Sequence, residues 1–167
     1  MSESLFAVRN ATGEDTAALI ELRALLLDGT GASYSSRSPE GTARWRAAYR
    51  NWLADNLGSN DSVRVLVAEH QASRQIIGCA TGIIDVRAPT SVNPNGLSGW
   101  IQSVVVAPQW RGHKVAKQLM QTLLRWYANR DVATVSLQTT DGAFRLYQTL
   151  GFSPSAERLL IRQEVPV

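Results

Sequence analysis

The stretch VVVAPQWRGHKVAK, residues 104–117, decides the fold of this chain. Its three valines predict the end of a buried strand, Pro108 interrupts that strand, and a basic turn precedes an apolar helical stripe. A strand, turn and helix in this order direct the free N–H groups of the first helical turn, and the positive end of the helix dipole, at one point. Such a helix start binds phosphate, and Gly112 lets the backbone approach closely. The basic side chains that would reinforce this site are Arg111, Lys114 and Lys117.

These residues alone leave two interpretations open, an anion site and a solvated helix start, because many strand–helix turns carry Arg and Gly for structural reasons. Two nucleotide motifs are excluded. The segment lacks the Gly-Lys-Ser/Thr ending of a P-loop and the three spaced glycines of a dinucleotide fingerprint. The placement of lysine favours the anion site, because Lys114 and Lys117 are the only lysines among 17 basic residues.

Outward from this segment, the hydrophobic pattern predicts alternating elements in the order β-α-α-β-β-β-α-β-α-β. The strands are expected at residues 6–9, 63–69, 75–85, 100–106, 132–138 and 159–163, and the helices at residues 12–26, 38–58, 115–126 and 143–150. Helices alternate with strands only in the second half. The sequence therefore predicts an α/β class with a mixed sheet of about six to seven strands, flanked by helices on both faces. Residues 87–99 form a long loop in this interpretation.

Composition restricts the class of protein. The chain has 167 residues, of which 44% are apolar and 19% charged, so we expect one globular domain over residues 1–167. No apolar run is long enough to cross a bilayer and the first residues lack a signal-peptide pattern, so we expect a cytoplasmic protein with no membrane partner. The net charge of +3 is too small to indicate nucleic acid by itself.

Cysteine and histidine point to no special chemistry. Cys79 lies in an apolar run, which predicts a buried thiol in a reducing compartment rather than a nucleophile. His70 and His113 lie far apart in the sequence, so we expect no metal. His113 fits an exposed turn residue first and a phosphate contact second.

Residues 104–117 resemble the main acetyl-CoA motif of the GNAT superfamily of N-acetyltransferases, Arg/Gln-x-x-Gly-x-Gly/Ala. Arg111, Val115 and Ala116 fit this motif, and Lys114 stands where the family has its central glycine. That side chain would either crowd the pyrophosphate or bind it.

Residues 137–152 resemble a second element of the same family, a strand followed by a helix that ends in Leu-Tyr-x-x-Leu-Gly-Phe. Thr140 stands where many members have Asn. The matching residues are Leu146, Tyr147, Leu150, Gly151 and Phe152. Two motifs at the right spacing identify the family much more strongly than either one does.

The resemblance implies that the chain moves an acetyl group from acetyl-CoA to a small-molecule or peptide amine. It also implies that the strand at residues 100–106 splays from its neighbour and pairs with the pantetheine arm. The residues that it assigns to the cofactor are Val104, Val105, Val106, Arg111, Gly112, His113, Lys114, Val115, Ala116, Lys117, Thr140 and Tyr147.

Tyr147 is the candidate general acid, because the family's tyrosine at this place points at the coenzyme sulfur and a phenol can protonate a thiolate. Packing of the short helix is the alternative role. The base is less clear, since many relatives carry a Glu on the central strand and this chain has Gln102 there. Glu69 and then Asp85 are the nearest replacements, although each also fits a solvated strand end, and a chain of waters is a third route.

Two other functions remain open. A GNAT-like domain that binds acyl-CoA without catalysis is compatible with Lys114 and with the missing strand acid. A nucleic-acid module would use Arg44, Arg46 and Arg50, but their spacing fits a solvated helix face, so no nucleic-acid partner is expected. The aromatic residues Trp45, Tyr49 and Trp52 fit helix packing first and an acceptor site second. Homodimers are common among relatives, so the resemblance allows one.

Overall fold

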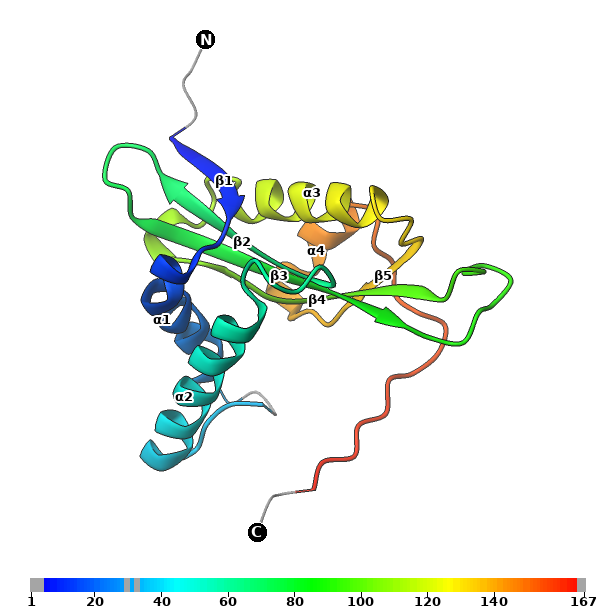
Figure 1. The fold of residues 1–167 in the computed structure, drawn as a ribbon, viewed down its shortest axis with the longest axis horizontal. Coiled ribbons are helices and arrows are strands. Elements are labelled where there is room, and N and C mark those ends of the chain that lie inside the picture. Colours follow the sequence, from blue (N-terminus) through cyan, green and yellow to red (C-terminus); the bar gives the residue numbers. More distant parts are fainter. Residues whose placement is uncertain (1–4, 29–30, 32–33, 165–167) are drawn as a thin grey trace.

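The computed structural model describes residues 5–28, 31 and 34–164, and it contains a five-stranded sheet in the order β1-β2-β3-β4-β5 (Figure 1). The strands are β1 (Phe6–Asn10), β2 (Val63–His70), β3 (Ile76–Val86), β4 (Leu97–Val106) and β5 (Thr134–Leu137). Neighbouring strands are antiparallel from β1 to β4, and β5 runs parallel to β4. The mixed sheet of the prediction is confirmed.

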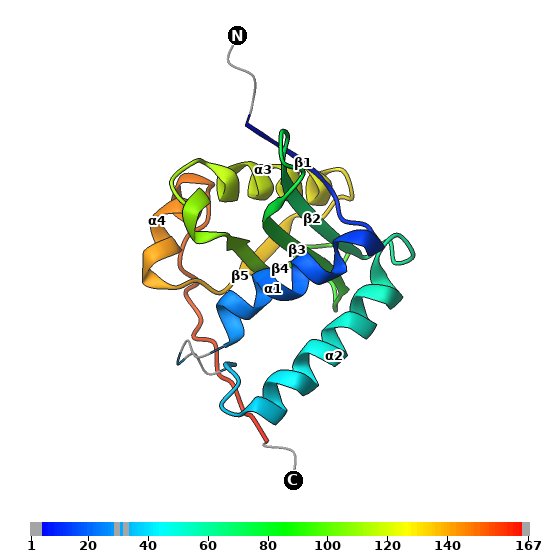
Figure 2. The same ribbon diagram turned by 90° about the vertical axis from the view of Figure 1, so that its left-hand side faces the viewer.

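Helices cover both faces of the sheet, as predicted (Figures 1 and 2). The 3₁₀ turn η1 (Gly13–Asp15), α1 (Thr16–Leu27) and α2 (Pro39–Asn56) lie on one side. The 3₁₀ turn η2 (Pro108–Trp110) joins β4 to α3 (Val115–Ala128), and α4 (Asp141–Thr149) follows β5. Both α3 and α4 pack on the face opposite α1 and α2, so the sheet separates two apolar cores.

The predicted apolar stripe of α3 holds this helix across the sheet. Val115, Leu119 and Leu123 are fully buried against it. Tyr127, one turn further on, donates a hydrogen bond to the carbonyl of Trp100 at 2.8 Å. Because these contacts fix the whole helix, they also fix the position of its first turn beside the end of β4.

Two glycines make room for this packing. A Cβ on Gly99 would lie 2.7 Å from Cε1 of Tyr127, and a Cβ on Gly82 would lie 2.7 Å from the Tyr127 hydroxyl oxygen. Real Cβ contacts are longer than this, so α3 approaches β3 and β4 closely only because both positions lack a side chain.

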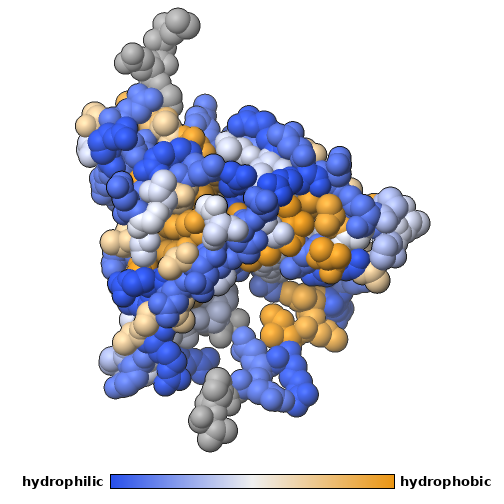
Figure 3. All heavy atoms as spheres, viewed as in Figure 1, coloured by the Kyte–Doolittle hydropathy of each residue, from blue (hydrophilic) through white to orange (hydrophobic). Residues whose placement is uncertain are grey.

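The strand count of six to seven was too high, because residues 159–163 form no strand. Their sequence, LLIRQ, lacks the alternation of a half-buried strand, and in the described part of the chain they pair with no other segment. Leu160 is 89% exposed as a result, and Figure 3 shows apolar surface along this end of the chain. Other boundaries moved little: β4 begins at Leu97, and β5 is shorter than expected.

Candidate active site

β5 pairs with only the first half of β4. Residues 98–101 of β4 pair with residues 134–137, and β5 ends there. Residues 102–106 continue along β3 on one side and have no strand partner on the other among the described residues. A cleft of about 630 Å³ opens between the diverging strands. Its walls come from α1, β4, the chain after β5, α4 and the C-terminal segment; they include Leu26, Ile101, Val104, Thr140, Tyr147 and Leu159.

A β-bulge shapes the edge of β4 at this cleft. Thr81 pairs with Gln102 and Cys79 with Val105, so two residues of β4 oppose one residue of β3. Ser103, the first residue of the bulge, has a φ of 54°, in the left-handed region. The bulge thus reorients the backbone of β4 at the point where the two strands part.

Contacts from α1 and β3 hold the bulge in place. The guanidinium of Arg23 donates a hydrogen bond from Nη1 to Oγ of Ser103. The thiol of Cys79 donates to the carbonyl of Ser103 at 3.5 Å. Cys79 is a buried free cysteine, as predicted, and burial raises the pKa of its thiol to about 12.

The basic turn lies at the far end of the same strand. Gly112 has a φ of 80° and Lys114 a φ of 64°, and α3 begins at the next residue. The left-handed region costs a residue with a Cβ about 1–2 kcal/mol, which explains why glycine suits the position of Lys114. The Lys114 side chain is exposed.

The start of α3 offers unbonded backbone donors. In the described part of the chain no acceptor is bonded to the N–H groups of Val115, Ala116 and Lys117. Arg111 donates from Nε to the carbonyl of Val106 at 3.4 Å, which ties the turn to the strand end. Arg111 and Lys117 are exposed, as is His113. The strand, turn and helix therefore have the arrangement expected of an anion site.

Tyr147 lies on the α4 side of the cleft. It is 7% exposed and packs edge-on against Phe152, with ring centroids 6.0 Å apart. Burial raises the pKa of its phenol above the ordinary value, so the group keeps its proton at neutral pH.

The two carboxylates proposed as bases lie outside the cleft walls. Glu69 is 6% exposed and binds Arg9 and Arg74, each at 2.6 Å. The interpretation of Glu69 as a solvated strand end was wrong, because these two arginines bind its carboxylate where β2 meets β1. Asp85 is half-exposed at the end of β3, with Arg87 at 3.6 Å, and does fit a solvated charge.

The structure adds residues that the sequence did not single out. A second cavity of about 260 Å³ lies on the α1 side of β4 and shares much of its wall with the cleft, including Ile101, Gln102 and Ser103 of β4. Arg23 and Tyr34 also line it. One signal pointed to Arg23 in the sequence: it is a charged residue on the apolar side of its helix, between Leu19 and Leu26 at helical spacing.

The α2 aromatics, whose second interpretation was an acceptor site, line neither cavity. Tyr49 packs its ring under the Arg23 guanidinium, 4.7 Å from the centroid, and Trp45 donates a hydrogen bond to Asp28 at 3.1 Å. The packing interpretation of these α2 aromatics fits those contacts. In the loop after β3, Asn95 donates to the carbonyl of Asp131 at 2.7 Å, so this loop contacts the chain after α3.

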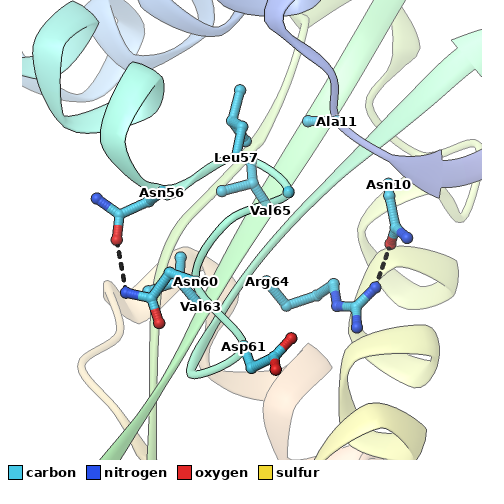
Figure 4. Close-up of a pocket in the computed structure, with 10 residues that line it drawn as sticks. Asn10, Ala11, Asn56, Leu57, Asn60, Asp61, Val63, Arg64 and Val65 are labelled. Atoms are coloured by element: carbon cyan, nitrogen blue, oxygen red, sulfur yellow. Dashed lines mark hydrogen bonds between the residues drawn. The ribbon is translucent and has the colours of Figure 1, made fainter.

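Figure 4 shows a separate depression of about 240 Å³ where the end of α2 meets the start of β2. Arg64 donates to the side chain of Asn10 at 2.8 Å, and Asn60 donates to Asn56 at the same distance. Two pairs of polar side chains in its wall are thus hydrogen-bonded to each other. None of the residues predicted for the active site lines this depression.

Among the described residues, no group of three or more His, Cys, Asp and Glu side chains could hold a metal ion. Among the helices that the structure describes, none combines the length and the apolar character needed to cross a membrane.

The family is settled by comparison with known proteins. The model of the Acetyltransferase (GNAT) family matches residues 26–152. The chain belongs to this family. That match spans both resembling segments, so the resemblance found in the sequence is confirmed. No curated protein sequence matches the chain.

Solved GNAT structures share the fold. A predicted acetyltransferase with acetyl-CoA from Clostridium acetobutylicum has a TM-score of 0.79 at 21% identity, covering 94% of this chain and 96% of its own. Glucosamine-6-phosphate N-acetyltransferase from Arabidopsis thaliana has a TM-score of 0.67 at 21% identity, covering 95% of this chain and 99% of its own. An aminoglycoside N-acetyltransferase in complex with CoA has a TM-score of 0.72 at 18% identity, covering 98% of both chains. At such identities these likenesses establish the fold.

Proposed function

We propose that this GNAT protein transfers the acetyl group of acetyl-CoA to a primary amine by direct attack. One observation carries the proposal: β4 leaves its partner at Ile101 and runs, unpaired on that side, to a basic turn and an open helix start. An extended amide chain can add to such a strand edge through main-chain hydrogen bonds. The pantetheine arm would bind there beside Val104 and Val106, and the pyrophosphate would bind at the helix start with Arg111, Lys114 and Lys117.

The chemistry requires a neutral amine and a protonated leaving group. The amine nitrogen bonds to the thioester carbonyl carbon, the C–S bond breaks, and the amine loses a proton while the sulfur gains one. Tyr147 supplies the proton to sulfur. Its support is its place in the cleft wall, where the phenol carries its proton at neutral pH.

The proton of the amine leaves through water in this proposal. Gln102 stands where many relatives carry an acid, and its side-chain amide cannot act as a base near neutral pH. Glu69 ranks first and Asp85 second as the carboxylate that finally takes the proton. Each needs a chain of waters, because neither lines the cleft. The variants Glu69→Gln and Asp85→Asn check this role. If both keep the wild-type pH–rate profile, solvent water rather than either carboxylate accepts the proton of the amine.

The experiment that tests the proposal is amine-dependent release of free CoA, measured with a thiol reagent over a panel of amines. Tyr147→Phe should lower turnover roughly tenfold or more, with the affinity for acetyl-CoA nearly unchanged. Unaltered turnover would remove Tyr147 from the mechanism. Binding of acetyl-CoA without turnover of any amine would support the second candidate, an acyl-CoA-binding domain without catalysis, which the missing strand acid and Lys114 favour.

Small molecules are the proposed acceptors. The aminoglycoside and glucosamine-6-phosphate acetyltransferases that share the fold support this class, and the cavity beside β4 has a volume of about 260 Å³, which suits a small amine.

A further inference from the structure

The cavity on the α1 side of β4 contains a cation without a carboxylate partner. Arg23 projects from α1 into its wall, half-buried. Its partners among the described residues are neutral: the hydroxyl of Ser103 and the ring of Tyr49. Among the described residues, no carboxylate lies within 4.0 Å of the Arg23 guanidinium.

The acids closest to Arg23 on its own helix are occupied elsewhere. Glu21 and Asp28 both bind Arg46 of α2, at 2.6 and 3.2 Å. Asp28 also accepts a hydrogen bond from Trp45. α1 therefore turns its carboxylates toward α2 and presents its arginine to the cavity.

The rest of the cavity wall is apolar or uncharged. Leu26, Leu27 and Trp100 form part of it, and Arg23 is the one charged side chain among its described lining residues. A guanidinium carries five N–H donors, and the bond to Ser103 uses one of its terminal nitrogens. Donors remain to bind a further acceptor, and an anion is the partner that compensates a half-buried cation best.

We propose that the acceptor of this enzyme is an amine that also carries an anionic group, a carboxylate or a phosphate, and that Arg23 binds this group. The inference rests on the proposed acetyl transfer, since it names the class of its second substrate. The cavity joins the cleft at Gln102 and Ser103. An acceptor whose anion lies against Arg23 therefore has its amine at the junction, where the thioester would be presented.

The same charge disfavours polycationic acceptors. A polyamine or an aminoglycoside would bring several ammonium groups beside an uncompensated guanidinium, with no carboxylate among the described lining residues to receive them. The acceptor of the structurally similar aminoglycoside acetyltransferase is therefore not the class expected here.

Equilibrium binding of matched amines to the protein saturated with CoA tests the inference without requiring catalysis. The pairs are phenylalanine against phenylalaninamide and glucosamine-6-phosphate against glucosamine, with spermidine as the polycation. One anionic member should bind about 10- to 100-fold more tightly than its neutral partner. The pair that shows this preference identifies carboxylate or phosphate as the group bound.

Variants separate binding by Arg23 from its contact with the bulge. Arg23→Gln should bring the anionic and neutral members of that pair to similar affinity, and Arg23→Lys should keep part of the preference. The ratio within a pair cancels any general effect of disturbing Ser103. Arg50 is an exposed arginine of α2 that lines neither cavity, so the control variant Arg50→Gln should retain the full preference for the anionic member.

Three outcomes overturn the inference: no preference in either pair, a preference that survives Arg23→Gln, or tighter binding of spermidine than of every anionic probe. If neutral amines release CoA and anionic amines show no preference over them, acetyl transfer would be supported and only the acceptor class would be refuted. Anion binding that depends on Arg23, with no amine acetylated, would refute acetyl transfer instead.

Discussion

Replacing Lys114 should change stability and cofactor affinity in opposite directions. Its φ of 64° costs a residue with a Cβ about 1–2 kcal/mol, and glycine avoids that cost. Glycine also raises the conformational entropy of the unfolded chain, which offsets about 0.4–1 kcal/mol of this stabilisation. Lys114→Gly should therefore stabilise the protein by about 0.5 kcal/mol and raise Tm by about 1–2 °C. Lys114→Ala keeps the left-handed cost and should give no increase.

We expect affinity for acetyl-CoA to depend on the charge of Lys114 rather than on its backbone conformation. Both variants remove an exposed ammonium from the proposed phosphate site, so both should bind acetyl-CoA about two- to fivefold more weakly. Thermal unfolding of the free protein and calorimetric titration with acetyl-CoA at about 0.1 M salt measure the two effects. A glycine variant less stable than the alanine variant would refute the conformational argument. A glycine variant that binds more tightly than the wild type would mean that the lysine side chain crowds the pyrophosphate.

Two further predictions concern buried charge. Burial raises the pKa of Cys79 from 9.0 to about 12, so above pH 9 the folded state keeps a proton that the unfolded chain loses. The free energy of unfolding should therefore fall above pH 9 by up to about 1.4 kcal/mol per pH unit. Cys79→Ala should remove that slope between pH 9 and about 10 in denaturant titrations; an unchanged slope would exclude the thiol. Arg9→Ala leaves Asp15 and Glu69 buried without their shared guanidinium and should cost about 2–3 kcal/mol near neutral pH. Since Arg9 lowers the pKa of Asp15 below 3.8, the cost should shrink as Asp15 protonates in acid, and a cost independent of pH would contradict this account.

Local signals predicted the elements that hold the site. The valines before Pro108 and the stripe of α3 gave a strand, a turn and a helix that the structure confirms, because such elements depend on residues close in sequence. The position of Lys114 was recognised as a departure from the family, and its left-handed φ supplies the physical reason for the usual glycine.

Features that depend on distant residues were not predictable in this way. The bulge at Ser103 depends on the register of two strands, which no local pattern contains. Glu69 was expected to be solvated, but Arg9 is 60 residues away in sequence and binds it in the fold. Residues 159–163 had strand-like composition, yet a strand requires a partner. Arg23 could be read as a charge on an apolar face, but only the packing of α1 on β4 placed it in a cavity.

Hydrogen–deuterium exchange of the free protein and of its complex with acetyl-CoA tests the central claim most directly. If the pantetheine arm pairs with the open edge of β4, acetyl-CoA should slow exchange in residues 102–106 and at the start of α3, residues 115–117. Residues 56–65, which line the separate depression, should exchange at the same rate in both samples. Unchanged exchange along residues 102–106 at saturating acetyl-CoA, or protection confined to residues 56–65, would contradict the proposed cofactor site.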